Sequence, residues 1–287
     1  MSKLGHAFAC AAALALAASA AAAQSGPPRP SPKATVSQVV GVTQIDISYS
    51  RPGVKGRQIW GGLVPHGQMW RTGANEATTI AFSTDVQVEG KPLPAGKYAL
   101  FTIPAADKWT VVFNRQGDQW GAFDHKPEED ALRIEITPRE APQLERMAFT
   151  IPEVTDTSAV VELRWEKLAV PFTVTVDTPR LAAERAAKET SAADASAGTL
   201  SAWARWALES DTAIDQAVGW AARSVQGDGA KSYWAGSVHA RLLAKAGKAA
   251  EARAEAERVL ALVADDSIPE MKADAERLRG ELAQWGA

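Results

Sequence analysis

Two different sequence periods divide this chain near Pro179, and they constrain its fold more than any other feature. Between Ala34 and Thr178, apolar and polar residues alternate in short runs, which is the period of a strand with one buried face. After Pro179 only one proline remains, Pro269, and Ala, Glu, Arg and Leu dominate, which is typical of helices. We therefore predict an all-β domain followed by an all-α domain.

The first part contains several strand-like runs bounded by Gly, Pro and Asp. Most of them alternate, and one is continuously apolar; the runs are residues 43–49, 98–103, 109–113, 132–136, 147–151, 159–165 and 172–176. The segment from Val88 to Tyr98 is interrupted by turns at Gly90 and at Pro94–Gly96. Because the connections are short, antiparallel pairing is favoured over a parallel sheet. The prediction for residues 34–178 is an antiparallel β-sandwich, with a barrel as the alternative.

The second part shows helical spacing of small and apolar residues. One stretch matches a tetratricopeptide-like helical hairpin at Ala240, Leu243, Gly247, Ala252, Ala256 and Val259. Residues 199–287 are therefore expected to form helical hairpins with a face for a protein partner. Residues 179–198 are Ala-rich and polar, and we expect a linker or a frayed helix there.

The N-terminus has the pattern of a secretory signal peptide. A weakly basic start at Lys3 precedes the apolar stretch Ala7–Ala18, and Ala21-Ala22-Ala23 suits cleavage after Ala23. Residues 1–23 are thus expected to be removed, which implies a periplasmic or secreted protein. The stretch is too weakly apolar for a membrane span, and no other segment qualifies. Residues 24–33 are Pro-rich and are expected to form an extended, poorly ordered leader.

Charge and motif content exclude several classes of function. The net charge of -3 gives no support to nucleic-acid binding. His66 and His125 stand near Glu76 or Asp130 only if the fold brings them together, and no metal-binding motif is present, so we predict no metal and no cofactor. No nucleophile elbow and no phosphate-binding loop occurs.

The most informative segment is a 28-residue stretch from Ser50 to Ala77 without a usable period. It carries apolar residues such as Ile59 and Trp60 that are costly to leave in water, so we predict an ordered loop folded over one end of the sandwich. Arginine beside tryptophan and asparagine is typical of sites for anionic or carbohydrate-like small molecules. The candidate ligand-binding residues are Arg51, Arg57, Trp60, Trp70, Arg71, Asn75, Glu76, Asp130 and Arg133.

Distinct roles follow from these residue types. The guanidinium groups of Arg57 and Arg71 would hold an anionic group, Asn75 and Glu76 would exchange hydrogen bonds, and Trp60 or Trp70 would stack on the ligand. The structural alternative is that the arginines pair with carboxylates inside the protein and that the tryptophans plug the end of the sandwich.

Long ordered motifs in this region resemble a known family. Ser50-Arg51-Pro52 begins a run that continues through Gly56-Arg57 to Pro65, and Trp70-Arg71-Thr72-Gly73-Ala74-Asn75-Glu76 follows; Pro94–Phe101, Trp120-Gly121, Asp130–Arg133 and Trp165-Glu166 also match. Over residues 34–178 these resemble the exported bacterial family catalogued as domain of unknown function 2911. The resemblance implies a β-rich domain and an extracytoplasmic location, but no activity and no catalytic residues.

Three functions remain open from the sequence. The favoured one is a non-catalytic exported binding protein with a polar or anionic ligand site in the 50–78 loop and a helical protein-interaction tail. The first alternative is a hydrolase of envelope glycans or esters that uses Glu76 and Asp130 as acid and base. The second is a structural assembly factor of the envelope whose tail recruits partners.

Overall fold

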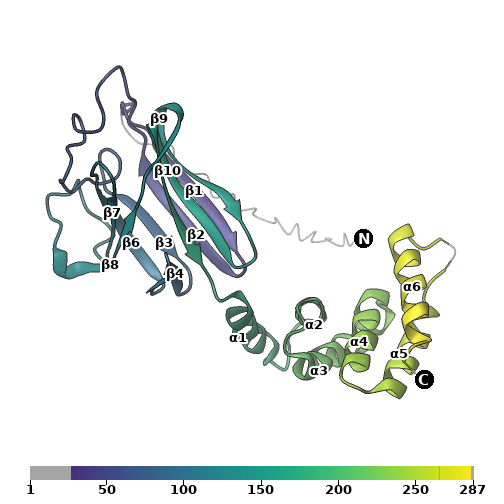
Figure 1. The fold of residues 1–287 in the computed structure, drawn as a ribbon. Coiled ribbons are helices and arrows are strands. Elements are labelled where there is room, and N and C mark those ends of the chain that lie inside the picture. The colour runs from purple at the N-terminus through teal and green to yellow at the C-terminus, as the bar shows by residue number, and fades with distance from the viewer. Residues whose placement is uncertain (1–26, 265, 286–287) are drawn as a thin grey trace, which may run out of the picture.

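The computed structural model describes residues 27–264 and 266–285, and it consists of a β-sandwich followed by helices (Figure 1). The predicted antiparallel sandwich and helical-hairpin tail are confirmed. The expected signal peptide lies outside the described residues. The strands are β1 (Lys33–Val40), β2 (Thr43–Ser50), β3 (Thr78–Phe82), β4 (Val86–Val88), β5 (Lys91–Leu93), β6 (Gly96–Ile103), β7 (Trp109–Asn114), β8 (Asp130–Ile136), β9 (Arg139–Val154) and β10 (Ser158–Thr175).

Two antiparallel sheets form the sandwich. One has the strand order β1-β2-β3-β6-β7-β8 and the other the order β5-β4-β10-β9. Strand β2 shows why the pattern folds this way: Ile45, Ile47 and Tyr49 are buried between the sheets, whereas Asp46 and Ser48 lie on the outer face. Side chains of a strand alternate between faces, so each alternating run contributes one half to the core and the other half to the surface.

The strands β9 and β10 are longer than the sequence pattern indicates. The runs at 159–165 and 172–176 belong to one 18-residue strand, β10. Register shifts flank Glu166, whose φ of 53° marks a bulge in the strand. A bulge changes the alternation locally while the pairing continues, so two runs in the sequence form a single strand.

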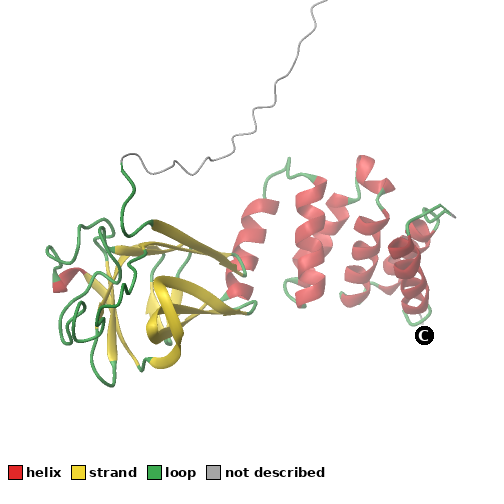
Figure 2. Ribbon diagram, turned by 90° about the horizontal axis from the view of Figure 1, so that it is seen from above, coloured by secondary structure: helices red, strands yellow, loops and turns green. Residues whose placement is uncertain are grey.

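Six helices follow in the described residues, in a row beyond one end of the sandwich (Figure 2). They are α1 (Thr178–Thr190), α2 (Ala197–Ser210), α3 (Ile214–Ser224), α4 (Tyr233–Lys245), α5 (Ala249–Leu260) and α6 (Pro269–Leu282), with short 3-10 helices at Pro127–Glu129 and Gly227–Lys231. The hairpin of α4 and α5 has the predicted small residues at its interface, with Ala240, Ala252 and Ala256 fully buried. None of these helices has both the length and the hydropathy required to cross a membrane.

Where a linker or frayed helix was expected, the structure has the regular 13-residue helix α1. The side chain of Asp177 caps its first turn by accepting from the Arg180 N–H, and Ala182 and Ala186 are buried. The helix also starts directly on the sandwich, since the Thr178 hydroxyl donates to the Asp156 carbonyl at 2.7 Å. The helix packs through few large apolar residues: Leu181 lies against the sandwich core, and the buried positions are Ala182, Ala186 and Thr190.

Candidate functional site

The predicted loop is ordered, and its tryptophans lie inside the sandwich. The Trp60 ring is edge-on to Trp109 at 4.8 Å, to Trp165 at 5.7 Å and to Trp70 at 5.9 Å between ring centroids. Trp70 in turn stacks on Trp165 at 5.8 Å. Because Trp109 and Trp165 come from opposite sheets, this four-tryptophan cluster closes the end of the core. The rings of Trp60 and Trp70 are engaged with each other and the core.

The arginines of the loop bind the main chain. Arg51 donates from Nε to the carbonyl of Met147 at 2.9 Å, and Arg57 donates to the carbonyls of Gly53 at 2.6 Å and Val54 at 3.1 Å. Arg71 differs, because its Nε is buried and has no hydrogen-bond partner among the described residues. Burial lowers the pKa of the Arg71 guanidinium.

Asn75 and Glu76 hold the segment that precedes β1. Asn75 donates from its amide to the Ser31 carbonyl at 3.2 Å, and Glu76 accepts from Arg29 at 2.7 and 3.0 Å. The Arg51 amide also donates to the Pro32 carbonyl at 2.9 Å. The hydrogen bond from Arg29 lowers the pKa of Glu76. The Pro-rich leader thus makes hydrogen bonds to the loop through Arg29, Ser31 and Pro32.

Asp130 and Arg133 belong to a separate network at the start of β8. The Asp130 carboxylate, 6% exposed, accepts from Arg133 at 2.6 and 2.8 Å and from Asn114 at 2.8 Å, and lies 2.9 Å from His125 Nε2. Burial raises the pKa of Asp130, but these hydrogen bonds outweigh it and the net pKa is lowered. Within residues 27–264 and 266–285, no group of three or more His, Cys, Asp or Glu side chains is arranged to hold a metal.

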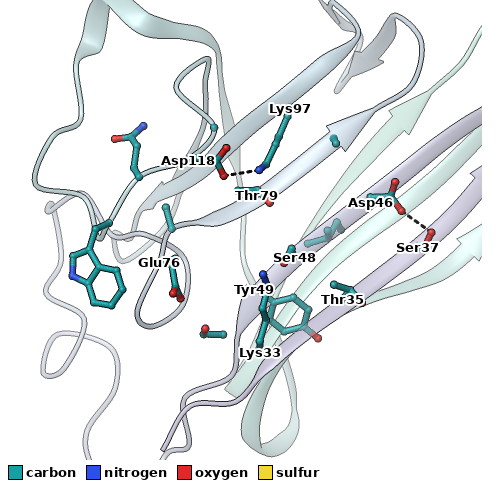
Figure 3. A pocket seen from close by; sticks show the side chains of 17 residues that line it. Lys33, Thr35, Ser37, Asp46, Ser48, Tyr49, Glu76, Thr79, Lys97 and Asp118 are labelled. Atoms are coloured by element: carbon teal, nitrogen blue, oxygen red, sulfur yellow. Dashed lines mark hydrogen bonds and ion pairs between the residues drawn. The ribbon is translucent and has the colours of Figure 1, made fainter. Parts of the chain in front are cut away.

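The predicted residues thus serve different parts of the sandwich, and one of them, Glu76, lines a cavity beside the loop. This cavity is an open groove of about 590 Å³ on the outer face of the six-stranded sheet (Figure 3). Strands β1, β2, β3 and β6 form its floor, and the loop after β7 forms its wall. Its lining side chains include Lys33, Thr35, Ser37, Asp46, Ser48, Glu76, Thr79, Lys97, Asp118, Gln119 and Trp120.

A row of hydroxyl groups crosses the floor of the groove. Thr35 on β1 is paired with Ser48 on β2, which is paired with Thr79 on β3. Neighbouring strands are about 4.8 Å apart, so the row presents one hydroxyl per strand at regular spacing. None of these three hydroxyls makes a hydrogen bond within the part of the chain that the structure describes, so all three are available to a ligand.

The charged groups of the groove are mostly neutralised by neighbours. Lys97 lies 2.5 Å from Asp118, and Glu76 is paired with Arg29. Asp46 accepts from the Ser37 hydroxyl at 2.6 Å. Glu76 and Asp118 are thus paired with cations, and Asp46 and Lys33, which form no ion pair within the residues that the structure describes, have opposite charges, so the groove has no net excess of either sign.

Trp120 adds an aromatic surface at the edge of the groove. Its backbone forms an isolated β-bridge with Glu76, and the amide of Ala77 donates to the Gln119 carbonyl at 3.0 Å. These contacts hold the wall against the end of β3. The indole is 58% exposed, which is unusual for so large an apolar side chain. The groove thus combines hydroxyls, balanced charge and one exposed indole.

The comparison with protein families assigns the sandwich. Residues 31–174 match the model described as "Protein of unknown function (DUF2911)", which is about half of the chain. The chain belongs to the DUF2911 family. No curated protein and no solved structure matches it. The DUF2911 match includes the tryptophan cluster, the Asp130 network and the groove, whereas the helices lie beyond it.

Most groove residues of this DUF2911 chain were missed from the sequence. Ser48 and Asp46 are the polar half of an alternating run, and Thr79 and Lys97 belong to strands that are not consecutive in the chain. The signal that was available is Trp120, which lies outside every strand-like run and is followed by Gly121. A tryptophan in a connecting loop, without an apolar period around it, indicates either a plug or an exposed contact surface.

Proposed function

We propose that this DUF2911 protein is a non-catalytic binding protein for an uncharged polyhydroxylated ligand, such as a segment of a neutral glycan. The observation that carries the proposal is the row of available hydroxyls from Thr35, Ser48 and Thr79 beside the exposed indole of Trp120. Sugar rings present hydroxyls at their edges and C–H groups on their faces. A groove with hydroxyl partners on its floor and an aromatic wall complements both.

The balanced charge of the groove supports an uncharged ligand over an anionic one. Two of the loop arginines, Arg51 and Arg57, donate to main-chain carbonyls, and Arg71 does not line the groove. The groove crosses four strands, β1, β2, β3 and β6, which supports an elongated ligand. The ligand site accordingly moves from the 50–78 loop itself to the sheet face beside it, with Glu76 at its end.

The test is a binding measurement with soluble oligosaccharides by isothermal titration calorimetry. The panel contains uncharged hexamers of glucose and of N-acetylglucosamine, together with polygalacturonate and inorganic phosphate as anionic probes. We expect binding of an uncharged member, and a loss of about three- to tenfold in Trp120→Ala, since stacking on an aromatic ring contributes on the order of 1 kcal/mol. Thr79→Val, which removes the hydroxyl at constant shape, is expected to weaken binding as well.

Phe123→Ala is the matched control. Phe123 is an exposed aromatic residue of the same loop, 82% exposed, but it does not line the groove. Binding that is unchanged in Trp120→Ala, or a panel in which only the anionic probes bind, would contradict the proposal.

The hydrolase alternative receives less support from the surroundings of its two carboxyl groups. Hydrogen bonds lower the pKa of both Glu76 and Asp130, so neither is held protonated as a general acid requires. Asp130 is also buried in its own network and does not line the groove. Turnover of a glycan that is lost in Glu76→Gln, with folding retained, would restore this alternative.

Export and partner binding remain part of the proposal. Sequencing the amino terminus of the protein isolated from expressing cells tests export, with Gln24 expected as the first residue. The protein-binding role of residues 199–287 is tested by capture of a partner with the full chain and its loss when these residues are removed.

A further inference from the structure

A second cavity lies at the junction of the sandwich with the helices. It has a volume of about 560 Å³, within the usual range for small-molecule sites, which occur preferentially between domains. The turn between β1 and β2, the turn between β9 and β10, and the helices α1 and α2 form its walls. Its residues lie outside the groove proposed above.

Two tryptophans of α2 form a corner of this cavity. The rings of Trp203 and Trp206 are perpendicular, at 88°, with centroids 5.5 Å apart. Trp203 is fixed in place because its Nε1 donates to Glu189 at 2.8 Å. Both rings line the cavity and both are only partly buried. Indole rings that line one space attract an organic cation placed over the face of a ring.

The charge of the cavity has the sign that this ligand needs. Asp156 and Glu209 line it, and neither side chain has an ion-pair partner in the described part of the chain. None of the described lining residues is Lys, Arg or His. The basic group near this end of α2, Lys245, is already paired with Asp211 at 2.6 Å and does not line the cavity.

The helix ends add to this polarity. Glu209, Ser210 and Thr212 lie at the C-terminal end of α2, where the last carbonyl groups place partial negative charge and no basic residue occupies the last turn. The first turn of α1 also lines the cavity, but two of the N–H groups that would give this end a partial positive charge are missing or already bonded. Pro179 has no N–H, and the Arg180 N–H is donated to Asp177.

We propose that the Trp203–Trp206 corner with Asp156 and Glu209 is a binding site for a small organic cation of the quaternary ammonium type. The occupant presents its cationic head to the two indoles and the two carboxylates. A ligand with a phosphate next to the cation is disfavoured, since the cavity offers that phosphate no basic partner. The proposal is independent of the sheet groove.

The experiment measures binding of choline to the full chain by calorimetry, against two matched probes. Neopentylcarbinol has the shape of choline without its charge, and phosphocholine has the same head group with an added phosphate. We expect choline to bind about tenfold or more tightly than neopentylcarbinol, and more tightly than phosphocholine. Equal affinities for choline and neopentylcarbinol, tighter binding of phosphocholine, or no binding of choline would overturn the proposal.

Variants locate the site. Trp206→Ala is expected to weaken choline binding about three- to thirtyfold, and Trp206→Phe to retain most of it. Glu209→Gln changes an exposed side chain, so it tests the charge even where Trp206→Ala does not fold. Trp120→Ala, in the sheet groove, is the control and is expected to bind choline unchanged. Unchanged affinity in Glu209→Gln or in a folded Trp206→Ala, or a loss in Trp120→Ala, would refute this location.

Discussion

Replacing Glu255 by glutamine tests how much one buried charge network stabilises the helical tail. Glu255 on α5 is 12% exposed and accepts from Arg258 at 2.7 Å through each of its oxygens, and His239 Nδ1 on α4 lies 3.2 Å away. Burial raises the pKa of Glu255, but the hydrogen bonds with Arg258 and His239 outweigh it and lower the pKa from 4.5 to about 2. The folded helices therefore strongly favour the ionised carboxylate.

The size of the effect follows from this shift. One pKa unit is about 1.4 kcal/mol, so lowering the pKa from 4.5 to about 2 corresponds to roughly 3 kcal/mol of stability at neutral pH. Because the pKa is lower in the folded state, this stability is present above pH 4.5 and is lost as the pH falls toward 2. Glu255→Gln keeps an acceptor but removes the charge, so we expect a loss of about 2 to 3 kcal/mol at pH 7.

The assay is urea unfolding followed by the helical circular dichroism signal at pH 7 and at acidic pH. Glu257→Gln is the control, since Glu257 is exposed on the same helix and has no ion-pair partner in the described residues. The difference in the free energy of unfolding between the two variants should be large at pH 7 and should narrow as the pH falls below 4.5. Equal stabilities at pH 7, or a gap that does not depend on pH, would refute the reasoning.

Three further changes probe other parts of the structure. Gly41→Ala places a Cβ 2.1 Å from the hydroxyl oxygen of Thr178, whereas the Cβ of Gly90→Ala, also at positive φ, meets nothing within 4 Å. Thermal unfolding should therefore show a loss of stability of about 2 to 4 kcal/mol for Gly41→Ala and of about 1 kcal/mol for Gly90→Ala. Asp130→Asn is expected to lower the free energy of unfolding by about 1 to 3 kcal/mol in urea at pH 7. This loss should become smaller as the pH falls below 3.8, because the pKa of the Asp130 carboxyl is lowered in the folded protein. Arg29→Ala removes an ion pair whose partners are about half exposed, so chemical unfolding should change by less than about 1 kcal/mol.

The architecture of this chain could be predicted well from local pattern, and the tryptophan cluster shows why. A period of two residues reports that one face of a strand is buried, which is a local property of the sequence. The apolar residues of the 50–77 loop had to be buried somewhere, since exposing Ile59 or Trp70 to water costs too much free energy. The ordered state of this loop was therefore predictable, even though the loop contains no helix or strand.

The partners of the polar groups were not predictable in the same way. Arg51 donates to Met147, which lies 96 positions later in the chain, and Glu76 is paired with Arg29, 47 positions earlier. Hydrogen bonds form between groups that the fold brings together, and an arginine binds a main-chain carbonyl as readily as a ligand. The residue types of the loop therefore did not reveal that Arg51 and Arg57 bind main-chain carbonyls.

The sequence by itself determined the two classes of structure, the boundary between them and the ordered loop, because hydrophobic periodicity and the cost of exposed apolar surface act along the chain. Only the tertiary structure decided which polar side chains meet. The row of Thr35, Ser48 and Thr79 exists because β1, β2 and β3 are paired in one register, and the Trp203–Trp206 cavity exists because α1 starts on the sandwich. Sites of this kind depend on distances between residues that are remote in the chain, and a single sequence carries no direct record of those distances.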